Sequence, residues 1–227
     1  MIHNRVIALI FRSCAALCAF IGILSHMNIG SGKLNLSLFL YYTIQSNLLA
    51  LILFIMLISR TVRGLLQEGK RGKTGYYPRF EMVCVVDLLL TLVVYWVMLA
   101  PSIFAMSEDY RIDSLRNITV HLIVPLACLI DYILFTDSNH LKYRDVYCVV
   151  LYPFFYLITS TIIGYSGYVY RVSAEDGGPV RFPYFFFDFD RIGAQSLLYI
   201  GALLIFFLIL SNGLYVFDKK VRKPGIG

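Results

Sequence analysis

Long apolar segments make up most of this chain and limit what it can fold into. A helix needs about 20 mostly apolar residues to cross a bilayer, and six such runs occur in the 227 residues. Only 15% of the residues are charged, against about 25% in a soluble domain. The sequence therefore predicts an all-α polytopic membrane protein with a single six-helix domain over residues 1–227. The predicted spans are 6–24, 36–59, 80–104, 118–135, 146–165 and 197–217.

Lysine and arginine are distributed unevenly between the predicted loops. With the amino terminus inside the cell, thirteen of these residues lie in cytoplasmic segments and six on the other side. Membrane proteins keep positive charge on the cytoplasmic side, so both termini are expected in the cytoplasm. The net charge of +6 is then mainly a topology signal that also favours anionic lipid headgroups. It does not indicate nucleic-acid binding.

Charged residues inside the predicted spans are costly in hydrocarbon and indicate pairing or function. Arg12, Asp87 and Asp131 all fall in the inner half of the membrane under this topology. We predict that Arg12 pairs with Asp87, Asp131 or both, as a structural ion cluster that fixes helix packing. The alternative is a proton or ion relay, which would need further acids across the membrane depth. Glu81 is expected at the membrane interface.

Polar side chains gather in the second span, in the stretch Tyr41-Tyr42-Thr43-Ile44-Gln45-Ser46-Asn47. On a helix, Thr43, Ser46 and Asn47 share one stripe. Hydroxyl and amide groups are costly in hydrocarbon when they lack partners. The stripe is therefore predicted to face a helix interface or a polar cavity.

His121 in the fourth span lies at a depth comparable to that of Thr43. A threonine hydroxyl becomes a nucleophile when an adjacent base takes its proton, and histidine is the side chain that titrates near neutrality. Together they would supply the nucleophile and the general base that acyl transfer needs. A buried histidine that only hydrogen-bonds a neighbouring hydroxyl is the simpler interpretation of the spacing.

Several short motifs occur together along the chain. They are Tyr42 to Asn47, His121 with Val124-Pro125, Asp131-Tyr132, Tyr152-Pro153 and Pro183 to Asp188. In this combination the chain resembles the androgen-induced protein family and its short bacterial relatives, and the resemblance covers nearly the whole chain. It implies an intramembrane, cofactor-independent hydrolase of a bacterial inner membrane that cleaves fatty acid esters of hydroxy fatty acids or similar membrane lipids. Carried over by residue, the nucleophile is Thr43 and the base is His121.

Such a mechanism needs groups that support the nucleophile and the base. Asn47 is the first candidate donor to an oxyanion and Ser46 the second. Asp131 lies roughly 15 Å beyond His121 on the same helix, too far to orient the imidazole. Asp188 and Asp190, in the aromatic part of the loop from 168 to 195, could reach it if that loop is a lid. The simpler interpretation of the loop is an interfacial anchor.

Other functions are open on the sequence alone. A non-catalytic lipid-binding or structural protein would keep the same fold. A small transporter would need discontinuous helices or repeats, and an ion-coupled protein would depend on the charged residues of the spans. No zinc, paired-cysteine or phosphate-loop motif is present, and no metal site is predicted.

Overall fold

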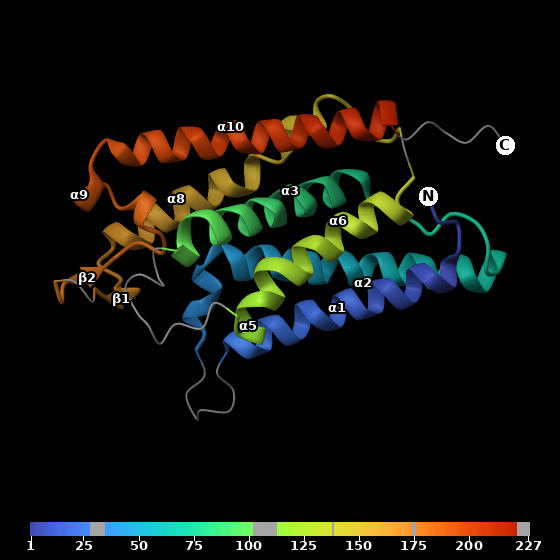
Figure 1. The fold of residues 1–227 in the computed structure, drawn as a ribbon, viewed down its shortest axis with the longest axis horizontal. Helices are drawn as coiled ribbons and strands as arrows, with labels where there is room; N and C mark the ends of the chain where they lie inside the picture. Colours follow the sequence, from blue (N-terminus) through green and yellow to red (C-terminus); the bar gives the residue numbers. More distant parts are fainter. Residues whose placement is uncertain (28–34, 102–112, 138, 174–175, 222–227) are drawn as a thin grey trace.

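The computed structural model describes residues 1–27, 35–101, 113–137, 139–173 and 176–221. Within these ranges it contains six helices long and apolar enough to span a membrane, so the predicted six-helix, all-α bundle is confirmed. In Figure 1 the amino terminus lies at the same end of the bundle as the end of the last helix. The helices cover Arg5–His26, Tyr42–Glu68, Pro78–Leu99, Leu115–Phe135, Asp145–Tyr165 and Gln195–Lys220.

Four of the six spans are assembled from more than one helical piece. π-helical turns, named η3, η4 and η6, continue or interrupt three of them, and such turns are frequent at functional sites. The pieces are α1 (Arg5–His26), α2 (Tyr42–Glu68), α3 (Pro78–Val94), η3 (Tyr95–Leu99), α5 (Leu115–Ile118), η4 (Thr119–Ile123), α6 (Val124–Phe135), α7 (Asp145–Cys148), α8 (Leu151–Tyr165), α10 (Gln195–Val216) and η6 (Phe217–Val221). The short loop elements are η2 (Ser37–Leu40), β1 (Arg171–Val172), β2 (Pro179–Val180), η5 (Phe185–Phe187) and α9 (Phe189–Ile192).

The second span differs most from its predicted bounds of 36–59. A separate 3₁₀ turn, η2, occupies its first residues, and Tyr41 then takes an extended conformation with φ −95° and ψ 136°. The α-helix begins only at Tyr42 and continues to Glu68, where Gly69 at φ 83° ends it. Thr43 therefore lies in the first turn of α2 rather than about two turns inside it.

Small residues let α1 approach its neighbours closely. Ala8, Ala15, Ala19 and Gly22 are all buried along one side of this helix. A Cβ built on Gly22 would lie 2.8 Å from Val120 Cγ1. The glycine thus permits close contact between α1 and the segment that carries His121, as small residues do in membrane helix interfaces.

Arg5 ties the start of α1 to the connection between α2 and α3. Its guanidinium donates hydrogen bonds to the carbonyls of Gly69, Arg71 and Lys73, over 2.6–2.9 Å, and pairs with Glu68. The carbonyl groups that follow a helix end lack helical partners, and this arginine supplies donors to them. The connection between α2 and α3 is therefore fixed at one point.

The core lies around α3, while α8 and α10 present apolar side chains outward. Val85 and Leu88 of α3 are fully buried. Leu198 and Ile205 of α10 are more than half exposed, as is Phe155 of α8. A ring of outward-facing apolar residues is expected where a bundle contacts lipid tails.

The connection from 166 to 194 folds back over one end of the bundle. β1 and β2 pair as a two-residue antiparallel hairpin, in which Arg171 lies opposite Val180. Beyond the hairpin, Phe182 packs against Gly164 so closely that a Cβ there would lie 2.5 Å from its ring. Residues 174–175 of this connection lie outside the described residues.

Candidate functional site

A cavity of about 180 Å³ lies between α2, α3, α8, α10 and the segment around η5. Phe154 of α8 and Leu204 of α10 line it and are also exposed on the outer surface of the bundle. The cavity therefore reaches that surface between these two helices. Its wall is mostly apolar, and the hydroxyl-bearing residues in it are Tyr42, Thr43, Thr91, Tyr156 and Tyr184.

Thr43 is a buried residue in the first turn of α2, and it lines this cavity. Its hydroxyl hydrogen-bonds the Tyr184 hydroxyl. Its carbonyl accepts hydrogen bonds from the side chains of Ser46, over 3.1 Å, and Asn47, over 2.8 Å. The backbone at Thr43 is thus fixed, while the hydroxyl can meet a ligand.

His121 lies in the π-helical turn η4 and is 7% exposed. Its ring stacks on Tyr95, from the π-helical turn η3, with centroids 3.5 Å apart and planes within 5°. The indole nitrogen of Trp96 donates to the His121 carbonyl over 3.2 Å. The imidazole Nδ1 is buried without a partner among the described residues. The stacking on Tyr95 therefore helps to orient this ring.

The two predicted catalytic residues lie in neighbouring segments that Asn47 connects. The Asn47 amide donates to the carbonyl of Thr43 and also, over 3.1 Å, to the carbonyl of Val120, directly before His121. Across the described parts of the chain, however, no hydrogen bond joins Thr43 to His121, and His121 is not a residue of the cavity wall. The predicted direct contact is thus not formed in this arrangement.

The predicted oxyanion donors serve other groups. Both Asn47 amide hydrogens are used by the two carbonyls, and Ser46 donates to the Thr43 carbonyl beside a 3.2 Å contact with the Thr91 hydroxyl. Neither residue lines the cavity. Asn47 and Ser46 therefore hold α2 against its neighbours, and the structure does not favour them as donors to a bound carbonyl.

Tyr184 lines the cavity beside Thr43. This tyrosine is not among the site residues predicted from the sequence. Burial raises the pKa of Tyr184 to about 12, although the Thr43 hydroxyl and the first backbone N–H groups of α2 act to lower it. The hydroxyl is therefore neutral at physiological pH. The motif Pro183 to Asp188 contained this residue, but only its place against α2 distinguishes it from the other aromatic side chains of the loop.

Two more tyrosines of α8 bind the start of α2. The Tyr156 hydroxyl accepts from the Tyr42 N–H over 3.1 Å and donates to the Leu40 carbonyl over 3.0 Å. The Tyr152 hydroxyl donates to the Gln45 side chain over 2.9 Å. Polar groups that would otherwise be unpaired at a buried helix start are satisfied in this way.

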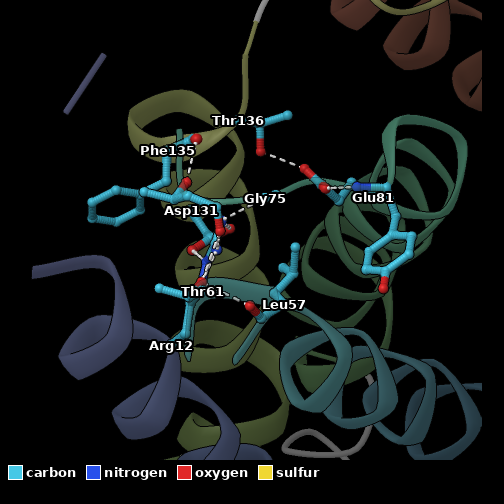
Figure 2. A network of polar contacts seen from close by, with 10 residues as sticks. Arg12, Leu57, Thr61, Gly75, Glu81, Asp131, Phe135 and Thr136 are labelled. Atoms are coloured by element: carbon cyan, nitrogen blue, oxygen red, sulfur yellow. Dashed lines mark hydrogen bonds and ion pairs between the residues drawn. The ribbon is translucent and has the colours of Figure 1, made fainter. Parts of the chain in front are cut away.

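Arg12 forms a buried polar network at the other end of the bundle, shown in Figure 2. It pairs with Asp131 through two hydrogen bonds of 2.8 and 3.2 Å. The remaining guanidinium hydrogens reach the Thr61 hydroxyl and the carbonyls of Thr74 and Gly75. Every N–H of the guanidinium is thus satisfied, as a buried charge requires.

Asp87 and Glu81 lie apart from this ion pair. Asp87 accepts a 2.8 Å hydrogen bond from the Tyr42 hydroxyl, and its other oxygen has no partner among the described residues. Of the two predicted partners, Asp131 pairs with Arg12, whereas Asp87 does not belong to the ion cluster. Glu81 is buried rather than interfacial, because the Thr136 hydroxyl and the Tyr77 N–H both donate to its carboxylate.

The acids of the aromatic loop do not reach the imidazole. Asp188 caps α9 by accepting the Arg191 N–H over 3.1 Å, and its carboxylate also lies 3.6 Å from that guanidinium. Asp190 is exposed. The expectation that either one orients His121 is not met, because helix capping and the nearby arginine engage Asp188. Among the described residues, no group of three or more potential ligands could hold a metal ion.

The fold is a bundle of six helices that are each long and apolar enough to span a membrane, as in a multipass membrane protein, with a mostly apolar cavity near its side. Comparison with protein-family models, curated proteins and solved structures gives no match. The resemblance to the androgen-induced proteins therefore rests on the short motifs given above.

Proposed function

We propose that this protein is an integral membrane hydrolase that cleaves fatty-acyl esters, with Thr43 as nucleophile and His121 as general base. The observation that carries this proposal is the place of Thr43. Its hydroxyl lines an apolar cavity that opens on the side of a bundle long enough to span a membrane. Ligand pockets are typically apolar with a few placed polar groups, and this one suits a lipid.

The cavity size limits how much of a lipid can enter. An engineered protein cavity of about 150 Å³ holds one benzene molecule, so a cavity of about 180 Å³ accommodates an ester group and a short part of its chain. The rest of the acyl chain would leave between Phe154 and Leu204. Fatty acid esters of hydroxy fatty acids, or similar fatty-acyl esters in the bilayer, fit this description.

The reaction can be written with its protons and electrons balanced. The Thr43 oxygen bonds to the ester carbon while its proton passes to the His121 imidazole, and the carbonyl electron pair moves onto the oxygen. Collapse of this intermediate breaks the ester bond, and the leaving alkoxide takes the proton from His121. Water then attacks the acyl-threonine by the same route. The products are a fatty acid and an alcohol.

His121 has to approach Thr43 for this chemistry. Catalytic hydrogen bonds often tighten only when substrate is bound. The imidazole Nδ1 has no hydrogen bond to break within the described chain, and a ring movement would alter the stacking on Tyr95. The bridge through Asn47 keeps the two segments together during that movement.

The proposed setting is a bacterial inner membrane with both termini in the cytoplasm. This orientation places the cavity toward the outer leaflet and Arg12 toward the inner one. The cationic residues of the cytoplasmic connections would then contact anionic headgroups.

A non-catalytic lipid-binding function is the second candidate. It is favoured by one observation, the position of His121 outside the cavity wall. A lipid could then occupy the cavity beside Thr43 without a base within reach.

Fluorophosphonate labelling of the purified protein distinguishes the two functions. For the hydrolase we expect labelling of wild type and Thr43→Ser, and loss of labelling in Thr43→Ala and His121→Ala. The matched control is Thr159→Ala, because this threonine of α8 is exposed and its hydroxyl donates hydrogen bonds only to backbone carbonyls of its own helix. Labelling that survives Thr43→Ala refutes the hydrolase. Crosslinking of a photoreactive fatty acid without any labelling would support lipid binding instead.

A further inference from the structure

Tyr184 is held over the cavity by an aromatic cluster. Its ring stacks on Phe186, with centroids 5.3 Å apart and planes within 4°, and it also contacts Tyr41 and Tyr156 at 6.3 and 6.4 Å. The loop that carries it is seated two residues earlier by Phe182 on α8. The side chain is thus positioned by packing from several directions.

The other cavity hydroxyls are engaged. Tyr42 donates to Asp87, Thr91 donates to the carbonyl of Asp87, and Tyr156 donates to the carbonyl of Leu40. Two hydroxyls of the wall remain, and among the described residues neither of them donates to a carbonyl or a carboxylate.

These two hydroxyls belong to Thr43 and Tyr184. The Thr43 hydroxyl hydrogen-bonds the Tyr184 hydroxyl, and this contact lowers the pKa of Tyr184 against the larger, opposite effect of burial. A phenol with a pKa of about 12 remains protonated at neutral pH, so it can donate a hydrogen bond but cannot act as a base.

We propose that Tyr184 is a catalytic residue that donates its hydroxyl to the carbonyl oxygen of the ester attacked by Thr43. The proposal rests on the hydrolase function described above. During attack, the electron pair of the carbonyl moves onto this oxygen, and the Tyr184 hydrogen bond strengthens without transfer of its proton. The donor is aimed at the place where negative charge develops, which is how oxyanion donors accelerate acyl transfer.

The test measures kcat and KM of Tyr184→Phe with a long-chain p-nitrophenyl ester. Removal of one oxyanion donor lowers kcat by about 10²–10³-fold, and we expect KM to change by less than about threefold because binding of the ground state is retained. The matched control is Tyr170→Phe. The Tyr170 hydroxyl is buried without a partner among the described residues, and its ring belongs to the same cluster through Tyr41. This control should keep the wild-type kcat.

A second measurement separates catalysis from a structural role of the loop. A long-chain trifluoromethyl ketone forms a tetrahedral adduct, whereas the matching methyl ketone mimics the substrate. Wild type should prefer the trifluoromethyl ketone strongly, and Tyr184→Phe should lose most of that preference. Unchanged preference, or a rise in KM with unchanged kcat, overturns the proposal. If Tyr184→Phe does not fold, 3-fluorotyrosine at position 184 keeps the shape but alters donor acidity, and an unchanged kcat then overturns it.

The proposed function and this inference fail in different ways. If turnover survives Thr43→Ala, the hydrolase itself is refuted. If turnover depends on Thr43 but Tyr184→Phe retains the wild-type kcat, only the role of Tyr184 is refuted.

Discussion

Substitution of one partner in the buried ion pair of Arg12 and Asp131 should cause one of the largest losses of stability in this protein. Arg12 is fully buried and donates five hydrogen bonds, two of them to Asp131. Asp131→Asn leaves the guanidinium charge buried without its counter-ion. Breaking a buried pair in this way costs about 3–5 kcal/mol, and we expect a loss of this size.

A double substitution tests whether the uncompensated charge is the cause. Arg12→Met with Asp131→Leu removes both charges and leaves two carbonyls and a threonine hydroxyl without the arginine. Each lost partner costs about 1–3 kcal/mol, but no charge remains in the interior. We therefore expect the losses of unfolding free energy in the single variants Arg12→Met and Asp131→Leu to add up to more than the loss in the double variant.

The measurement is reversible unfolding in mixed micelles, followed by tryptophan fluorescence. Arg144→Met and Asp190→Asn are the matched controls, since both residues are exposed, and they should leave the midpoint unchanged. An Asp131→Asn variant as stable as these controls would contradict the reasoning. The reasoning would also be contradicted if the stability loss of the double variant equalled the sum of the losses in the two single variants.

Three further substitutions follow from close contacts in the structure. Gly72 has φ 125°, and a Cβ there would lie 2.6 Å from an Arg5 nitrogen, so Gly72→Ala should cost about 1–3 kcal/mol in thermal unfolding. Gly164→Ala should push on Phe182, destabilise by about 1–3 kcal/mol, and lower ester turnover further than that loss explains. Asp87→Asn should be at least as stable as wild type in the same unfolding assay, because the amide oxygen still accepts the hydrogen bond from Tyr42 and no carboxylate is buried. A loss of stability as large as that expected for Asp131→Asn would refute this view.

Much of the fold could be predicted because hydrocarbon imposes a simple rule on sequence. Apolar runs of spanning length identified all six helices, and a buried arginine had to find an acid. The sequence could not choose between Asp87 and Asp131, since that choice depends on which helix packs against α1. The start of α2 was also missed, because Leu36 to Leu40 is as apolar as the helix and only the extended Tyr41 interrupts it.

The site was predicted less completely than the fold. The polar stripe located Thr43, Ser46 and Asn47, but helical spacing cannot say which side chain faces a cavity and which joins two helices. The π-helical turn around His121 changes the direction of its ring relative to a regular helix. Tyr184 lies in a loop without periodicity, so its contact with α2 could not be derived from spacing.

The distance along the chain between Arg12 and its partner has a consequence for biosynthesis. Asp131 is 119 positions later, and translation at about 5–20 residues per second separates the two by about 6–24 s. During that interval the first segment lacks Asp131, the acid that pairs with its guanidinium in the folded protein. It must wait at the headgroup layer or beside the insertion machinery, and it reaches its final depth only after the fourth segment has been made.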